Sequence, residues 1–371
     1  MSRPATVAWV LRRALPLVIL AVAVASCSGG QTPSDTTVPT QSGSTVPTPT
    51  AATSGATSAA TSGITSGAGS SGPSDSPTGS VYYSQADALM RYEFGSRTES
   101  VVFEGGDSFT VSVAQGKFAW AENNFFSNTS RVHIHELATP SNVTTLELAV
   151  LLESAPEFAP GTDRLGALAR STDSPDTRTD LLIFDEQGAT VGRIPHVKDF
   201  SFSPDGQDVL ISAEALDGDG TVIGWALAVV EDVHGGDQRT VTIAEFGDYG
   251  QLPTDLAVAP SSTQAVFTHA EHLHTVPLRE SATPHQVTES RFHEVDAAWS
   301  PDGQQLIFVA TGEGDFDLGC GELRIAPAHP AAPVPVPANA WDNAPADPTQ
   351  PVDVQGKVIH ACDSPSMYWV G

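Results

Sequence analysis

The sequence contains two copies of one segment, and this repetition constrains the fold more than any other feature of the chain. FSFSPDGQDVLIS at Phe200–Ser212 returns as AAWSPDGQQLIFV at Ala297–Val309. In each copy an alternating apolar run leads into Ser-Pro-Asp-Gly, whose Pro and Gly suit a tight turn, and a second apolar run follows. Self-similarity of this kind is typical of repeat folds, and the unit corresponds to half of a four-stranded β-propeller blade.

Four weaker copies extend the pattern along the chain. They lie around Pro160 (FAPGTDRLGALA), around Pro260 (VAPSSTQAVFT), at Val111–Ala121 and at Asp363–Val370. The intervals between the turn prolines are close to the ~40–50 residues that one blade of four strands needs. We therefore predict an all-β, six-bladed β-propeller over residues 81–371, with a five-bladed or unclosed ring as the alternative.

The two ends of this region suggest how the ring closes. The last copy has residues for an inner pair of strands only, while Ala88–Phe94 and Ser100–Phe103 supply two further apolar runs near the start. If these runs complete the sixth blade, N- and C-terminal strands share one sheet and protect its edges.

The copies at Phe200–Ser212 and Ala297–Val309 resemble the WD40-like repeat of TolB-type propellers. The resemblance is specific over these two segments and implies only the architecture of residues 81–371. The N-terminal domain of TolB has no counterpart before the repeats, so the resemblance does not imply a role in translocation.

Residues 1–26 have the pattern of an export signal. Arg12 and Arg13 precede the apolar run Ala14–Ala25, which is short for a transmembrane helix. The run leads into Cys27 through small residues, and this junction resembles the bacterial lipobox. The resemblance implies that Cys27 becomes the lipidated first residue of the mature protein, whereas an ordinary secretory signal is the alternative. Two or three acyl chains, such as palmitate, would hold the protein stably on the extracytoplasmic face of the cell membrane.

Residues 27–80 comprise this cysteine and a predicted disordered tether. Ser28–Ser80 consists almost entirely of Ser, Thr, Gly, Ala and Pro, with Asp35 and Asp75 as its charges. Such a composition cannot build a core. Its coil dimension would be on the order of 40 Å, enough to hold the propeller away from the membrane.

The formal net charge of −27 limits the classes of partner. So acidic a surface repels nucleic acid and anionic lipid, and it favours cations, basic proteins or neutral ligands. Solubility alone is the simpler explanation of the charge. We expect a monomer that does not bind nucleic acid.

Two cysteines remain after Cys27. Cys320 and Cys362 form an even pair in an exported chain, which predicts a disulfide.

Chemistry is expected on the face opposite the Ser-Pro-Asp-Gly turns, where the long loops between the second and third strands of each blade lie. Several of these loops carry acids, so we expect a negative potential there. The pattern at Asp217 and Asp219 resembles the start of a calcium loop, with a solvated turn as the alternative. The other candidate binding-face residues are Asp173, Asp176, Glu313, Asp315, Asp317 and Trp341, the last of them in the Pro- and Ala-rich insertion 327–351.

Histidines give a second candidate for a metal ion. His272 and His274 lie two apart on a predicted strand, so both face one side and could be two of three zinc ligands. The sequence places no third ligand, and paired surface histidines are the alternative.

Searches for catalytic patterns give little. The folded region has neither a Gly-x-Ser-x-Gly nucleophile elbow nor a Gly-x-x-x-x-Gly-Lys phosphate loop. The sequence therefore favours a membrane-anchored, non-enzymatic binding scaffold for an envelope protein or glycan, without a required cofactor. The alternatives are a metal-dependent, lactonase-like hydrolase that uses Ca²⁺ or Zn²⁺, and an accessory sensor domain for an envelope kinase or transporter.

Overall fold

The computed structural model describes residues 77–371, apart from 86, 107–108, 113–114, 171–177, 218, 220, 236–237, 248–250, 291–292, 312–319, 337–348 and 363–366. Every regular element among these residues is a β-strand. The described part of the chain therefore offers no helix that could cross a membrane. Cys27 and the predicted tether lie outside the described residues.

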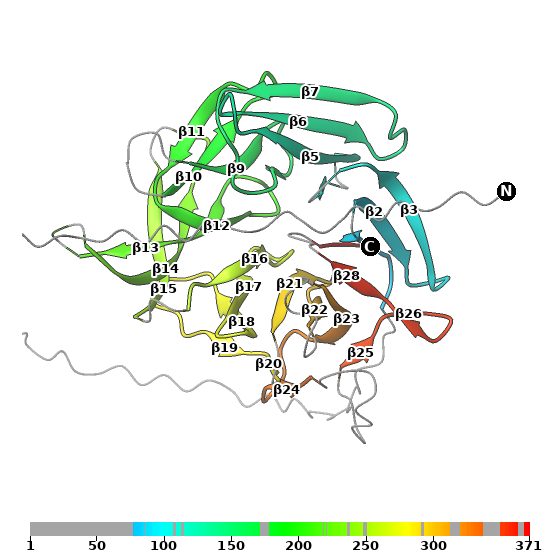
Figure 1. The fold of residues 1–371 in the computed structure, drawn as a ribbon. Helices are drawn as coiled ribbons and strands as arrows, with labels where there is room; N and C mark the ends of the chain where they lie inside the picture. Colours follow the sequence, from blue (N-terminus) through cyan, green and yellow to red (C-terminus); the bar gives the residue numbers. More distant parts are fainter. Residues whose placement is uncertain are drawn as a thin grey trace, which may run out of the picture. The chain divides into compact units, whose positions relative to one another are not determined.

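The strands form a ring of six sheets, which we call blades I to VI (Figure 1). Each blade is antiparallel, and its first strand lies nearest the centre of the ring. From the centre outward, blade I contains β29 (Tyr368–Val370), β1 (Ser80–Gln85), β2 (Ala88–Glu93) and β3 (Thr98–Glu104). Blade II contains β4 (Thr110–Ser112), β5 (Lys117–Asn124), β6 (Thr129–Glu136) and β7 (Val143–Leu148). Blade III contains β8 (Glu157–Phe158), β9 (Leu165–Arg170), β10 (Thr179–Phe184) and β11 (Thr190–Ile194).

The other three blades complete the ring, and two short pairings lie outside it. Blade IV contains β12 (Val197–Phe202), β13 (Val209–Leu216), β14 (Val222–Glu231) and β15 (Arg239–Phe246). Blade V contains β16 (Thr254–Val258), β17 (Gln264–His269), β18 (His272–Pro277) and β19 (His285–Gln286). Blade VI contains β21 (Glu294–Trp299), β22 (Gln305–Ala310) and β23 (Cys320–Pro327), and β23 pairs at its outer edge with β25 (Gln350–Pro351) and β28 (His360–Cys362). Outside the blades, β20 (Thr288–Glu289) pairs with β24 (Val334–Pro335), and β26 (Asp353–Val354) pairs with β27 (Lys357–Val358).

Blade I confirms closure by both ends of the chain but corrects how the strands are shared. The C-terminal end contributes one strand, β29, rather than an inner pair, and three N-terminal strands follow it. The missing strand is β1, where Val81 pairs with Trp369 and with Tyr92. Val81 and Tyr83 are fully buried, so this segment packs as a central strand of the sheet.

The Ser-Pro-Asp-Gly segments form the turn between the first and second strands of blades IV and VI, as predicted. Ser203 Oγ donates to Asp205 Oδ1 at 2.6 Å and accepts from the Asp208 backbone N–H at 2.9 Å. Gly206 adopts a φ of 69°, a conformation that residues with a Cβ rarely adopt. Ser300, Asp302 and Gly303 repeat the arrangement. The two copies of the repeat therefore form the same turn, with the same hydrogen bonds and the same glycine conformation.

Apolar side chains fill the spaces between neighbouring blades. Ile183 of blade III and Val209 of blade IV belong to one such cluster, and Phe267 of blade V and Leu210 of blade IV belong to another. Trp299 assists this packing, since its Nε1 donates to Ala257 O of blade V at 3.0 Å. Burial of this kind is the main stabilising contribution in a propeller, and it leaves polar groups for the channel and the loops.

Candidate functional site

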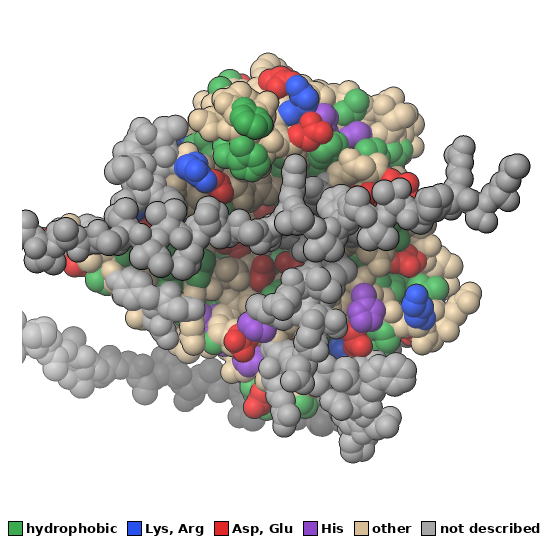
Figure 2. Space-filling view, in the orientation of Figure 1, with side chains coloured by type: hydrophobic (Ala, Val, Ile, Leu, Met, Phe, Trp, Pro, Cys, Tyr) green, Lys and Arg blue, Asp and Glu red, His purple; other side chains and the backbone are tan. Residues whose placement is uncertain are grey.

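The centre of the ring is a channel lined by the first strand of all six blades. At the end near the Ser-Pro-Asp-Gly turns it holds a cavity of about 330 Å³, whose lining includes Pro160, Pro204 and Pro260. A smaller space of about 70 Å³ is lined by Glu157, Asp255 and Asp296. Acidic side chains are visible at the middle of the ring in Figure 2.

Three of the channel aspartates occupy the same position in their repeats. Asp199, Asp255 and Asp296 each precede a turn proline by five residues, in blades IV, V and VI. The strand register is irregular at or beside each of them. Asp255 and Asp296 also have positive φ values of 55° and 54°, which aspartate tolerates better than most residues. These three aspartates were not among the residues predicted from the sequence, although their constant spacing from the turn proline marks them.

Hydrogen bonds to Glu157, Asp199 and Asp255 connect blades III, IV and V each to the next blade. Glu157 Oε1 of blade III accepts from the backbone N–H of Phe202 in blade IV at 3.0 Å. Asp199 Oδ2 of blade IV accepts from the backbone N–H of Leu256 in blade V at 3.2 Å. Asp255 of blade V is hydrogen-bonded to both the backbone and the side chain of Asp296 in blade VI. The acids therefore join four consecutive blades around the channel.

The enclosure of these carboxylates makes their ionisation unfavourable. Burial raises the pKa of Glu157 to about 8, and the nearby charge of Asp199 adds to the effect. Burial and the charge of Asp255 raise the pKa of Asp199 to about 7, and burial also raises the pKa of Asp255. Each of these three residues is partly exposed toward the channel, yet protein surrounds it on most sides. Glu157 therefore holds a proton near neutral pH, and Asp199 is partly protonated there.

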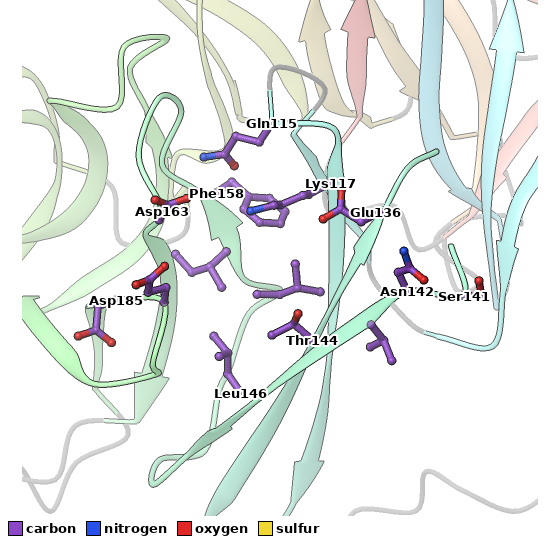
Figure 3. A pocket seen from close by; sticks show the side chains of 14 residues that line it. Gln115, Lys117, Glu136, Ser141, Asn142, Thr144, Leu146, Phe158, Asp163 and Asp185 are labelled. Carbon is purple, nitrogen blue, oxygen red and sulfur yellow. The ribbon is translucent and has the colours of Figure 1, made fainter. Parts of the chain in front are cut away.

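A larger cavity lies away from the channel, between blades II and III (Figure 3). Its volume is about 640 Å³. The lining residues come from strand ends and turns at the same end of the blades as the Ser-Pro-Asp-Gly turns. This is the face opposite the one predicted to bind ligand.

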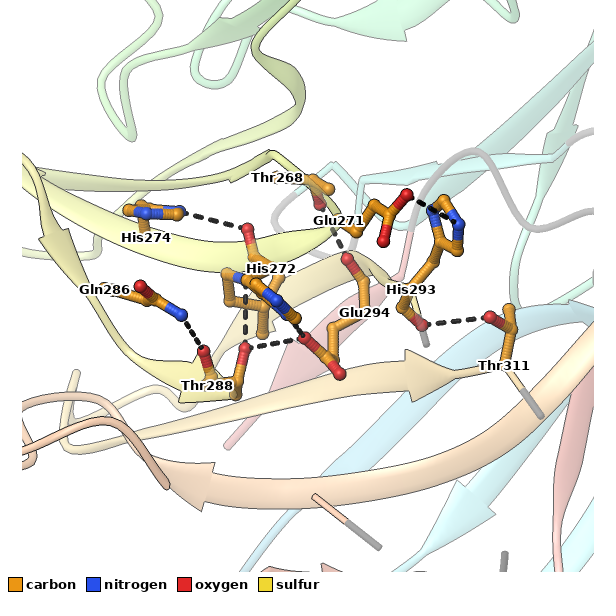
Figure 4. Close-up of polar contacts among 10 residues, drawn as sticks. Thr268, Glu271, His272, His274, Gln286, Thr288, His293, Glu294 and Thr311 are labelled. Carbon is orange, nitrogen blue, oxygen red and sulfur yellow. Dashed lines mark hydrogen bonds and ion pairs between the residues drawn. The ribbon is translucent and has the colours of Figure 1, made fainter. Parts of the chain in front are cut away.

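On the predicted binding face, a buried polar cluster joins blades V and VI (Figure 4). His272 Nδ1 lies 2.8 Å from Glu294 Oε2, which also accepts from Thr288 Oγ1 at 3.0 Å. The Glu294 side chain is 1% exposed, and burial raises its pKa. His272 is thus held by a carboxylate of the next blade.

His274, the second predicted zinc ligand, lies on the same strand as His272 but has a different environment. Its Nδ1 is 3.1 Å from the carbonyl oxygen of His272, and its ring stacks on Phe267. Burial lowers the pKa of His274 to about 4, so the ring is neutral at physiological pH. Over the described ranges, no group of three or more His, Cys, Asp or Glu is placed to hold a metal ion.

Of the acidic loop candidates, the structure describes Asp217 and Asp219. Asp217 Oδ1 accepts from the backbone N–H groups of Asp219 at 3.0 Å and Thr221 at 2.8 Å, so this carboxylate closes its own turn. Nearby, Glu214 is paired with Arg178, His196 and Lys198, which offsets negative charge on that face. The remaining candidates lie outside the described residues: Asp173, Asp176, Glu313, Asp315, Asp317 and Trp341.

The predicted disulfide partners lie opposite each other. In the antiparallel pairing of β23 with β28, Cys320 is the direct register partner of Cys362. Directly opposed residues of antiparallel strands have Cα atoms ~4.5–5.5 Å apart, which is within the range that a disulfide spans. A bond between them stays a prediction.

The tip of the β5–β6 hairpin exposes two phenylalanines on the predicted binding face. Phe125 is 71% exposed and Phe126 is 104% exposed. Asn124 Oδ1 accepts from the backbone N–H groups of Phe126 at 3.1 Å and Ser127 at 3.3 Å, and Asn128 has a positive φ of 52°. An ordered turn therefore holds two adjacent rings in solvent, which is unusual for a soluble surface.

Comparison with known proteins identifies the architecture. No family model matches the chain, and no curated protein matches it. TolB from Acinetobacter baumannii has 15% sequence identity and a TM-score of 0.50, over 68% of this chain and 62% of TolB. A candidate TolB from Agrobacterium tumefaciens has 12% identity and a TM-score of 0.49, over 78% of this chain and 99% of its own. The chain thus spans less than two thirds of the Acinetobacter protein, and the likeness shows the fold alone.

Proposed function

We propose that this TolB-like β-propeller is a lipid-anchored, extracytoplasmic binding scaffold for a protein or glycan of the cell envelope. The lipobox-like junction at Cys27 and the Ser- and Thr-rich segment 28–80 support the anchor and the tether. The closed ring of six blades supports the scaffold, because propellers offer rigid faces from which loops contact a partner.

The pair Phe125 and Phe126 carries the binding part of the proposal. Exposed aromatic rings lose little conformational entropy on binding and are enriched among the residues that dominate interface energies. The hairpin tip from Glu122 to Ser130 has one acid at its edge and is otherwise uncharged, in a chain with 44 acidic residues. An apolar, prefolded tip on an acidic protein fits a partner that offers an apolar pocket.

The anchor can be tested directly. In cells fed radiolabelled palmitate, we expect the wild-type chain to be labelled and to sediment with membranes. Cys27→Ser should remove both the label and the sedimentation. If the Cys27→Ser chain still sediments with membranes, the anchor at this position is wrong.

The binding site is tested by substituting both rings. The double variant Phe125→Ser, Phe126→Ser should lose a specific cross-linked product that wild-type protein forms in intact cells. Val101→Ser is the matched control, since Val101 is another exposed apolar side chain, at 52%, on the outer strand of blade I. Loss of the product in both variants, or in neither, contradicts the proposal.

The metal-dependent hydrolase is the second candidate function. The channel does bring carboxylates from four blades near one another, but no three of them among the described residues are placed to hold a metal ion. Their contacts are with backbone N–H groups, with the hydroxyls of Thr254 and Thr268 and with each other, an arrangement that suits structural connection of the blades. Elemental analysis of purified protein tests this alternative, which predicts stoichiometric Ca²⁺ or Zn²⁺.

A further inference from the structure

We propose that the cavity between blades II and III binds a basic peptide segment with an apolar side chain at its centre. The inference rests on the proposed function only in taking the propeller as a binding module, and it needs neither the lipid anchor nor the Phe125–Phe126 tip. It concerns the face that carries the Ser-Pro-Asp-Gly turns. The loops that carry the predicted ligand-binding residues lie on the opposite face.

The cavity is formed where two sheets diverge. Lys117 begins β5, Glu136 ends β6 and Val143 begins β7 in blade II. In blade III, Asp163 lies in the β8–β9 turn and Asp185 in the β10–β11 turn. The volume of about 640 Å³ lies within the ~300–1,000 Å³ typical of ligand pockets.

The floor of the cavity is apolar. Leu146, Phe158 and Leu165 are at most 6% exposed and belong to the core cluster between blades II and III. Ile134 packs against the same cluster. A ligand side chain inserted here would contact a rigid surface made by two sheets, so an aliphatic group fits the floor better than a charged one.

The rim is acidic. Glu136, Asp163, Asp185 and Glu186 line the cavity, against one cation, Lys117. Within the described residues none of the five forms an ion pair, whereas Glu153, Asp180 and Glu214 elsewhere in blades III and IV are paired with arginine or lysine. Asp185 Oδ1 accepts from two backbone N–H groups of its own turn and Glu186 Oε1 from the Gln187 amide, and these neutral donors leave the negative charge of both carboxylates uncompensated. Four carboxylates against one ammonium give the cavity a net negative charge, which favours a cationic ligand.

One further group at the cavity accepts hydrogen bonds. Gln115 Nε2 donates to the carbonyl oxygen of Thr162, which fixes the amide. Its Oε1 is buried and has no hydrogen-bond partner among the described residues. This oxygen is closed off from solvent, so a ligand N–H would reach it only after the Gln115 side chain turns. The preference for a donor-rich chain therefore rests on the acidic rim, whose carboxylates accept hydrogen bonds from a peptide backbone or a lysine ammonium.

The test uses the purified full chain and three fluorescein-labelled tetrapeptides in anisotropy titrations. The probes are acetyl-Lys-Leu-Lys-Lys, its variant with Ala in place of Leu, and acetyl-Glu-Leu-Glu-Glu. We expect the first peptide to bind, the Ala variant to bind at least threefold more weakly, and the acidic peptide not to bind. Equal binding of the Leu and Ala peptides would overturn the apolar part of the proposal.

Two charge-matched double variants locate the site. Asp163→Asn, Glu186→Gln should weaken binding by about tenfold, whereas Glu245→Gln, Glu280→Gln should change it less than twofold. Glu245 and Glu280 are exposed residues of blade IV and the region after β18, away from the cavity. Lys117→Gln should tighten binding, because it removes the one repelling charge. Equal weakening by both double variants would show attraction to overall charge, and the site would then be wrong.

Discussion

Asp199 Oδ2 accepts a hydrogen bond from the backbone N–H of Leu256 at 3.2 Å, so a carboxylate of blade IV holds the first strand of blade V. The same side chain accepts from Phe200 N at 2.8 Å within its own strand. Asp199 thus connects two blades at the centre of the ring. It contributes to stability as a hydrogen-bond acceptor, and a protonated carboxyl group can also accept these bonds.

Removing this acceptor should destabilise the ring. Asp199→Ala leaves the Leu256 N–H without its partner, and an unsatisfied buried donor costs about 1–3 kcal/mol. Asp199→Asn keeps a carbonyl oxygen at the same place and should retain most of the stability. Urea unfolding of both variants at pH 7 measures the difference, and equal loss in the two would contradict the role as acceptor.

Stability should fall as the pH rises through neutrality. The folded-state pKa values of Asp199 and Glu157, about 7 and about 8, lie above the ordinary values of 3.8 and 4.5. Protons are therefore held more tightly in the folded state, so the stabilisation is complete below about pH 4 and is lost up to about pH 8. Calorimetry should give a higher Tm at pH 5 than at pH 8.5, and Glu157→Gln with Asp199→Asn should reduce this difference. If the double variant shows the same difference in Tm between pH 5 and pH 8.5 as the wild type, other titrating groups cause the pH dependence.

The two repeat glycines should respond differently to alanine. Gly206 and Gly303 share a φ of 69°, so Ala at either position costs about 1–2 kcal/mol of backbone strain. At Gly206 a Cβ would also collide with the carbonyl oxygen of Pro160 in blade III, whereas nothing lies within 4 Å at Gly303. Gly206→Ala should therefore be the more destabilising substitution in urea unfolding. Equal losses would mean that blade III moves aside freely.

Cys320 and Cys362 should be bonded in protein exported to an oxidising compartment. Mass spectrometry after alkylation without reductant should find neither thiol modified. Closing a loop of this length stabilises a protein by roughly 3–4 kcal/mol in the chain-entropy treatment, so Cys320→Ser should lower the Tm by several degrees. Two alkylated thiols in the exported protein would show that the register pairing exists without the bond.

The turns and the number of blades were predictable because Pro and Gly restrict the backbone locally, as at Pro204 and Gly206. The division of blade I was predicted incorrectly, because β29 has three residues and β1 directly follows a Ser- and Gly-rich segment. The aspartates at 199, 255 and 296 repeat visibly, but their partners depend on the register between blades. The cavity at Lys117 depends on the separation of two sheets, which no local pattern encodes.

The central claim is that a membrane-anchored propeller binds its partner through the Phe125–Phe126 tip. Photo-cross-linking in intact cells tests this claim most directly. A photoreactive amino acid replaces Phe126 in one chain and Val101 in another, each with Cys27 or with Cys27→Ser. We predict a defined heteromeric product only from the Phe126 position and only with Cys27 present. The same product from the Val101 position, or an equal yield without Cys27, would contradict the account.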